Sequence, residues 1–146
     1  MLYTLLFTVF LQTDVYIKTL NKMAKEPLQF VSEKLIEYDL LIFDDALHSA
    51  AEPWDFYNQL IETDGDQIDL VFIEVLSVDA QSAIDRYTQE KDSKKEILAP
   101  AFQDTFNGMG FTYQTVLDFL TSVKSYNQNH QKKIRVIAVD VPVFWA

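Results

Sequence analysis

A short apolar run that ends in two carboxylates constrains the fold of this chain more than any other stretch. Leu40 to Phe43 is apolar at every position, which is typical of a strand that is buried on both faces of a parallel sheet. Asp44 and Asp45 follow directly, and charged side chains cannot extend such burial without partners. The pattern therefore predicts a central strand over residues 39–44, with the chain leaving the sheet at these two acids.

The residues after the acids predict a turn and then a helix. Ser49 and Glu52 have the spacing of a capping box, in which Ser is the N-cap and Glu follows three residues later. Pro53 is tolerated in the first turn, because the first N–H groups of a helix have no acceptor within the helix. His48 is then expected in a strand-to-helix turn at the positive end of a helix, where open α/β sheets place their sites.

Strand-like and helix-like segments alternate along the rest of the chain. Further strands are predicted over residues 68–75 and 134–140, and apolar spacing predicts helices between them. Such alternation indicates right-handed crossovers between parallel strands. We therefore expect an α/β fold with a mostly parallel sheet of at least three strands and helices on both of its faces. The predicted helices cover residues 13–23, a segment that opens at Pro27, the capped segment to about Glu62, a segment that begins after Asp79, and residues 97–106 and 112–126.

Composition excludes several classes of protein. The chain has 146 residues, of which 49% are hydrophobic and 14% aromatic, so it has enough apolar side chains for a folded core. The formal net charge is -10, from 12 Lys and Arg against 22 Asp and Glu, and this charge repels nucleic acid and anionic membranes. The chain has no Cys, which excludes disulfides, thiolate metal sites and cysteine nucleophiles.

The N-terminal end differs in character from the middle. Residues 2–11 form an almost unbroken apolar run, too short to cross a bilayer as a helix, so no stable membrane insertion is expected. The run resembles the core of a secretory signal, but no Lys or Arg precedes it and no small-x-small site follows. Export therefore stays open, a cytoplasmic location is favoured, and a buried first element is the alternative. We expect residues 1–26 to form an apolar segment with a helix, and 27–146 one α/β domain.

The C-terminal end suggests that the domain is incomplete. The apolar residues after the last predicted strand run straight to Ala146. Complete domains rarely end in this way. We expect either a protein that continues beyond this point or pairing with another subunit, including self-association, through the 134–146 strand.

All three predicted strands end in acids, and a histidine follows the first. Asp44 and Asp45 end the first strand, Glu74 the second and Asp140 the third. Because parallel strands place their carboxyl ends on one edge, these acids are expected to converge there with His48. A neutral imidazole held by an acid is a suitable general base for activating water, and the same donors suit a divalent cation. Acids at strand ends also commonly cap helices, so the purely structural interpretation stays open beside the functional one.

Three other features carry less weight. His130 lies in a polar segment and is predicted to be solvated. Gly108 and Gly110 lack the third glycine and the preceding strand of a nucleotide-binding loop. Ser49 has no Gly-x-Ser-x-Gly setting, which argues against a serine-hydrolase elbow.

Four segments, in order along the chain, resemble motifs of the erythromycin esterase-like proteins, which belong to a wider group with the haem-binding uptake proteins and the Tiki/TraB-type proteins. Asp44-Asp-Ala-Leu-His-Ser49 resembles the family's Gly-Glu-Ala-Thr-His-Gly motif, and Glu52-Pro-Trp-Asp-Phe56 resembles the start of the helix that follows it. Ile68-Asp-Leu-Val-Phe-Ile-Glu74 is similar to its second strand, and Ile134-Arg-Val-Ile-Ala-Val-Asp140 to its Val-Arg-Val-Val-Gly-Phe-Asp strand. The likeness extends from about Asp39 to the C-terminus.

The resemblance implies a hydrolase-like site that acts on an ester or related bond of a small molecule and requires no cofactor. His48 would be the water-activating base, Asp45 would replace the family's Glu, and Glu74 would orient or polarise, with Asp44 and Asp140 in support. The family's Gly-Glu pair is Asp-Asp here, and no residue of this chain matches the second His that the family draws from a later half of its fold, so an inactive member is one form of this reading.

Two alternatives come from the same group of families. One is a metal-dependent hydrolase of the Tiki type, with His48, Asp45, Glu74 and Asp140 as ligands. The other is a non-enzymatic module that binds haem or a partner protein through its C-terminal strand.

Overall fold

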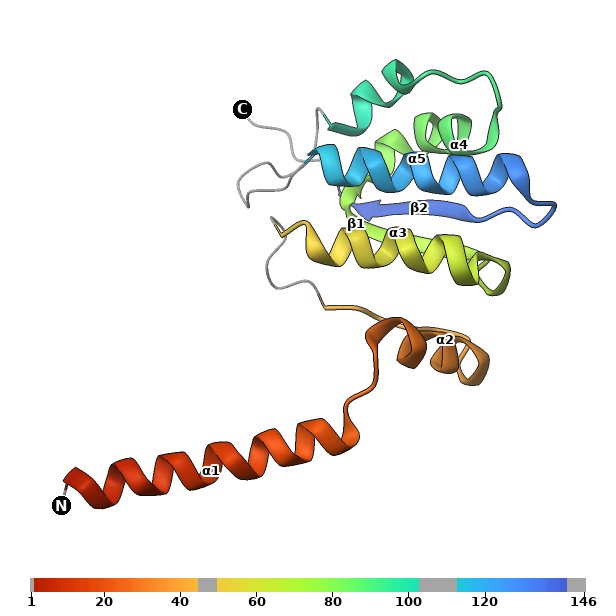
Figure 1. Ribbon diagram of the computed structural model, residues 1–146. Coiled ribbons are helices and arrows are strands. Elements are labelled where there is room, and N and C mark those ends of the chain that lie inside the picture. The colour runs from red at the N-terminus through yellow and green to blue at the C-terminus, as the bar shows by residue number, and fades with distance from the viewer. Residues whose placement is uncertain (1, 45–49, 103–112, 142–146) are drawn as a thin grey trace, which may run out of the picture.

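The computed structural model describes residues 2–44, 50–102 and 113–141 (Figure 1). Helices dominate these ranges, and two strands lie among them. The elements are α1 (Leu2–Met23), α2 (Pro27–Glu37), α3 (Glu52–Asp64), β1 (Leu70–Ser77), α4 (Gln81–Gln89), α5 (Tyr113–Asn129) and β2 (Arg135–Asp140), with 3₁₀ segments η1 (Gly65–Gln67), η2 (Val78–Ala80) and η3 (Lys95–Phe102).

β1 and β2 pair in parallel, which confirms the two strands predicted for this part of the chain and their parallel direction. The register is regular from Leu70 opposite Arg135 to Ile73 opposite Ala138. It then shifts, so that the next pair is Ser77 with Asp140. More residues of β1 than of β2 lie between these last two pairs, as in a β-bulge. The chain returns from β1 to β2 through α4, η3 and α5.

The strand predicted over residues 39–44 is absent, and the prediction of at least three strands is wrong for the described ranges. Residues 40–44 have no regular secondary structure, and Ile42 is 85% exposed. Phe43 instead contacts α3, where its ring centroid lies 6.1 Å from that of Phe56 and 5.5 Å from that of Tyr57. An apolar run forms a strand only where another strand offers unpaired backbone, and here contact with a helix takes its place.

The helices cover one face of the sheet, so the prediction of helices on both faces is also wrong for the described residues. The other face leaves Leu70 50% exposed, Phe72 56% exposed and Val139 46% exposed. Alternate side chains of a strand point to opposite faces, so each strand contributes one buried and one open set. The buried core between the sheet and α3, α4, η3 and α5 includes Trp54, Ile61, Ile73, Leu76, Ile84, Leu98, Phe119, Leu120, Val123, Ile134 and Val136.

The helices themselves follow the apolar spacing of the sequence. On α5, the side chains at i, i+3, i+4 and i+7 are all at most 3% exposed, as expected for a face turned to the core. α2 begins at Pro27 as predicted and buries Val31. α3 buries Trp54 and Ile61. The four core residues of α5 are Val116, Phe119, Leu120 and Val123.

The predicted helix caps are displaced. α3 begins at Glu52 after Ala51, which makes no side-chain capping bond. The predicted N-cap, Ser49, lies outside the described residues. Asp79 falls in η2 rather than at the start of α4, and its backbone N–H donates to the Ser77 hydroxyl at 3.3 Å.

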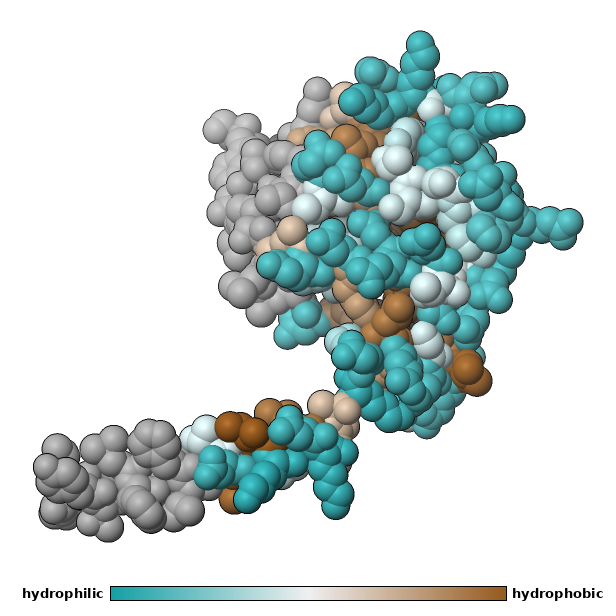
Figure 2. Space-filling model, in the orientation of Figure 1, coloured by the Kyte–Doolittle hydropathy of each residue, from teal (hydrophilic) through white to brown (hydrophobic). Residues whose placement is uncertain are grey.

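α1 extends through residues 2–11 as well as the predicted 13–23, and it leads away from the rest of the molecule (Figure 1). Its described side chains include exposed large hydrophobic residues, among them Tyr16 and Leu20, and Figure 2 shows brown patches on the described part of this helix. Within the described ranges, neither this helix nor any other combines the length and apolar character that a membrane crossing requires.

Candidate functional site

The carboxyl ends of β1 and β2 lie at the end of the molecule where α3 and α5 begin (Figure 1). We call this end the strand-end rim and define it by Ser77, Asp140 and the first turn of α3. It is the position at which open parallel sheets bind ligands. His48 and Asp45 lie outside the described residues, but the chain resumes at Ala50, two residues before α3.

Asp140 lies at the rim, as the sequence predicts. It is the last residue of β2, is half-buried, and accepts a hydrogen bond on Oδ1 from the Val141 N–H at 2.8 Å. Alternation along β2 places it on the helix-covered face, because Val136 and Ala138 are buried there.

Glu74 lies elsewhere. It is exposed in the middle of β1, which continues to Ser77 because Val75 and Leu76 extend the apolar run and Leu76 is fully buried. Alternation after Phe72 places Glu74 on the open face, opposite to the face of Asp140. Asp44 is exposed before α3. The structure therefore places one of the predicted acids at the rim, and it sets Glu74 apart from it.

Trp54 is a rim residue for which the sequence predicts no role beyond its place at the start of a helix. Its ring contacts those of Tyr57 and Phe119, with centroids 5.8 Å away in each case. The indole is buried, yet its Nε1–H finds no acceptor among the described residues. A buried donor left without any partner would cost about 1–3 kcal/mol. The sequence signal that could identify it is its position six residues after His48, in the first turn of the helix.

His130 is exposed, as predicted, and has a structural explanation. Its ring stacks on Tyr126 with centroids 4.0 Å apart and an interplanar angle of 9°. Its Nδ1 lies 2.9 Å from the Tyr126 carbonyl oxygen. The second histidine of the chain therefore caps the end of α5.

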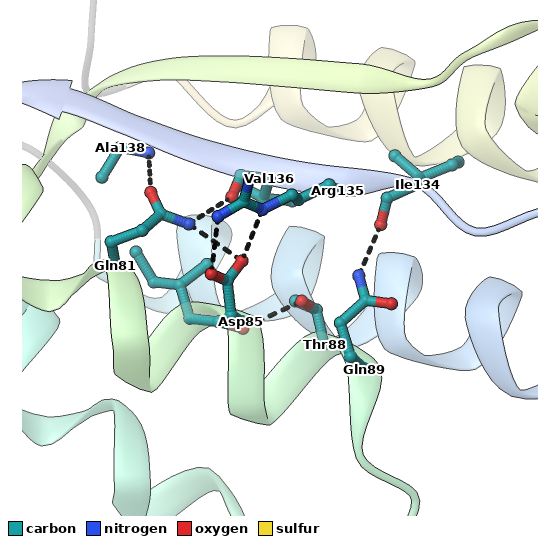
Figure 3. Close-up of polar contacts among 9 residues, drawn as sticks. Gln81, Asp85, Thr88, Gln89, Ile134, Arg135, Val136 and Ala138 are labelled. Carbon is teal, nitrogen blue, oxygen red and sulfur yellow. Dashed lines mark hydrogen bonds and ion pairs between the residues drawn. The ribbon is translucent and has the colours of Figure 1, made fainter.

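A polar cluster along β2 closes the outer edge of that strand (Figure 3). The Gln81 side chain donates to the Val136 carbonyl at 2.9 Å and accepts from the Ala138 N–H at 2.8 Å. Gln89 donates to the Ile134 carbonyl at 3.0 Å. Side chains of α4 thus satisfy backbone groups that a third strand would otherwise pair, and this explains part of the failed strand prediction.

Asp85 and Arg135 complete that cluster. Arg135 donates through Nε and Nη2 to the two carboxylate oxygens at 3.0 and 2.9 Å, a bidentate arrangement. The hydrogen bonds from Arg135, and then from Gln81, hold the pKa of Asp85 below its ordinary value. All of these groups have partners, so the cluster supports β2 and offers no free acid or base.

The described residues form no metal centre, and comparison with known proteins identifies no family. Within the described part of the chain, no group of three or more His, Cys, Asp and Glu side chains is arranged to hold a metal ion. Of the ligand set predicted from the sequence, His48 and Asp45 lie outside that part, and Glu74 and Asp140 face opposite sides of the sheet. No family model, curated protein or solved structure matches this chain.

Proposed function

We propose that this chain is a hydrolase-like domain in which His48 activates water at the strand-end rim, for attack on an ester or related bond of a small molecule. The observation that carries the proposal is the parallel pairing of β1 and β2, which directs Asp140 to the end of the molecule where α3 begins. His48 precedes α3 by only four residues. The order of the family-like motifs along the chain is a second, independent support.

In this proposal His48 is the general base and a carboxylate orients its imidazole. Asp45 takes this part by the resemblance, and Asp140 is the strand acid whose position suits the rim. The N-terminus of α3 carries partial positive charge that favours a developing oxyanion, and the buried Nε1–H of Trp54, which has no acceptor among the described residues, lies in the same turn. Glu74 lies on the open face of β1 and takes no direct part in the proposed reaction.

The experiment compares the only two histidines of the chain. We expect hydrolysis of at least one member of a panel of p-nitrophenyl esters, and we expect His48→Ala to lower its rate about 10²–10⁴-fold. His130→Ala is the matched control and leaves the rate unchanged. Activity should fall as the pH drops below about 6.5, where an ordinary imidazole becomes protonated. No turnover with any ester, or equal rates for the two variants, contradicts the proposal.

Chelation tests the metal-dependent alternative. In the proposed mechanism the rate is the same with and without a chelating agent. A loss of activity that added Zn²⁺ restores would replace metal-free base catalysis by the Tiki-type mechanism.

A further inference from the structure

The two outer edges of the sheet differ in whether their backbone groups have hydrogen-bond partners. On β2, the edge is occupied by the side chains of Gln81 and Gln89. On β1, the Arg135 N–H donates to the Asp69 carbonyl at 3.0 Å, and in a parallel ladder alternate residues point their backbone groups to opposite sides. Val71 and Ile73 therefore face β2, whereas Leu70 and Phe72 direct their N–H and C=O groups away from it. Within the described ranges, no hydrogen bond uses those outward groups.

The open edge is also exposed and apolar. Leu70 and Phe72 are at least half exposed, and Glu74 follows them on the same face. Proteins usually protect such an edge with charges, bulges or a covering element. β1 carries one charge, and the bulge that begins after Ile73 limits the regular open part to the first four residues of the strand, Leu70 to Ile73.

We propose that this edge of β1 accepts, as an added strand, a short extended segment of a partner protein that carries two apolar residues and one basic residue at alternate positions. Strand addition uses backbone hydrogen bonds for affinity and alternate side chains for specificity. Leu70 and Phe72 suit apolar side chains, and Glu74, the single charge of β1, suits Lys or Arg opposite to it.

Charge selects a basic partner over a second copy of the chain. Each copy carries a formal net charge of -10, so association of two copies is opposed by like charge. Pairing two copies of β1 also provides no basic side chain for Glu74, because the strand contains none. This surface is separate from the rim and does not depend on His48.

The test uses the full chain and two short fluorescent peptides, a lysine peptide with the pattern Val-Ser-Val-Ser-Lys and a glutamate peptide with Glu in place of the Lys. Fluorescence anisotropy should show binding of the lysine peptide alone. Glu74→Lys should weaken that binding about tenfold, since a favourable cross-strand charge pair becomes a repulsive one. Asp92→Lys is the matched control, with the same charge change at an exposed residue of the loop after α4, and it should leave the affinity within about twofold.

Amide hydrogen exchange separates strand addition from general charge attraction. Binding should slow exchange at Leu70 and Phe72, whereas Val71 and Ile73 are already protected by β2 in the free chain. Phe72→Pro removes an outward N–H without removing a ladder bond. We expect it to weaken binding about tenfold, with an unchanged circular dichroism spectrum.

Three results would overturn the proposal. The first is equal weakening by Glu74→Lys and Asp92→Lys. The second is binding of the lysine peptide without new protection at Leu70 and Phe72. The third is protection of these two amides in the peptide-free chain together with the molar mass of a dimer, which would assign the edge to a second copy.

Discussion

Asn127 exchanges two hydrogen bonds with the backbone of Ile134. Its Nδ2 donates to the Ile134 carbonyl at 2.9 Å, and its Oδ1 accepts from the Ile134 N–H at 2.8 Å. The same amide also donates to the Thr88 carbonyl at 3.1 Å. Asn127 is only 2% exposed, so these bonds fix the start of β2 between the ends of α4 and α5 without competition from water.

Replacing Asn127 by Ala should lower the free energy of unfolding by about 2–4 kcal/mol, because it leaves buried backbone groups without partners. Asn129→Ala is the control, since Asn129 is exposed and bonds only to the Ser125 carbonyl of its own helix at 2.9 Å; it should cost less than about 1 kcal/mol. Urea denaturation followed by circular dichroism measures both. Equal losses would show that the Ile134 contact carries little weight.

Gly65 lies against the ring of Tyr126 at the end of α3. A Cβ added to Gly65 would lie 2.5 Å from Tyr126 Cε2, although the backbone there is ordinary for any residue, with φ -57° and ψ -24°. Gly65→Ala should therefore destabilise by about 1–3 kcal/mol through overpacking alone. In a double-mutant cycle with Tyr126→Ala, the two losses should sum to more than the loss of the double variant. Strict additivity would contradict the contact.

The ion pair of Asp85 with Arg135 predicts a pH dependence of stability. The pKa of Asp85 is lowered in the folded chain, first by the hydrogen bonds from Arg135. The stabilisation is therefore complete above the ordinary aspartate pKa of about 3.9 and is lost as the pH falls through the folded value.

Asp85→Asn should accordingly have a lower denaturation midpoint than the parent chain at pH 7, with the difference shrinking as the pH is lowered below about 4. Asp92→Asn, at an exposed loop position, should show no such difference at either pH. A gap between Asp85→Asn and the parent that stays constant down to the acid transition would rule out the linkage.

Gln81 should protect the backbone of β2 from solvent. In Gln81→Ala the Val136 carbonyl and the Ala138 N–H lose their partner, and we expect a loss of about 1–2 kcal/mol and faster amide exchange at Ala138. Gln81→Glu retains an acceptor for the Ala138 N–H but loses the donor to Val136, and its charge repels Asp85. It should therefore keep more protection at Ala138 than Gln81→Ala at low pH, where both acids are protonated. Identical exchange in all three chains would contradict this role.

Periodicity in the sequence identified the elements that pack against one core. Val116 and Leu120 lie on the face of α5 that their spacing predicts, and the apolar runs around residues 70–76 and 134–139 are strands because each has the other as a parallel neighbour. Each of these elements is visible as a short apolar pattern, and the element that packs against it is visible in the sequence in the same way.

The sequence does not predict that side-chain amides from distant helices bond to the outer edge of β2 in place of another strand. Nothing in the spacing of Gln81 or Asn127 shows that their amides bond to the outer edge of β2, so the apolar run at residues 40–43 alone predicts a further strand. The position of Glu74 depends on where β1 ends, and with Leu76 buried the strand continues to Ser77, three residues beyond Glu74. The face of a strand residue reverses with each step, so an error in a strand boundary becomes an error in the composition of the site.

The amides of Gln81, Gln89 and Asn127 also bear on the order of folding. The strand β2 docks against α4 and α5, because side chains of these helices bond to the Val136 carbonyl, the Ala138 N–H and the backbone of Ile134 just before the strand. Helices form from local contacts, whereas the pairing of β1 with β2 closes a loop of more than fifty residues. We therefore expect β2 to dock late in folding. A variant that removes a helix side chain bonded to the backbone of β2 should then speed unfolding more than it slows refolding.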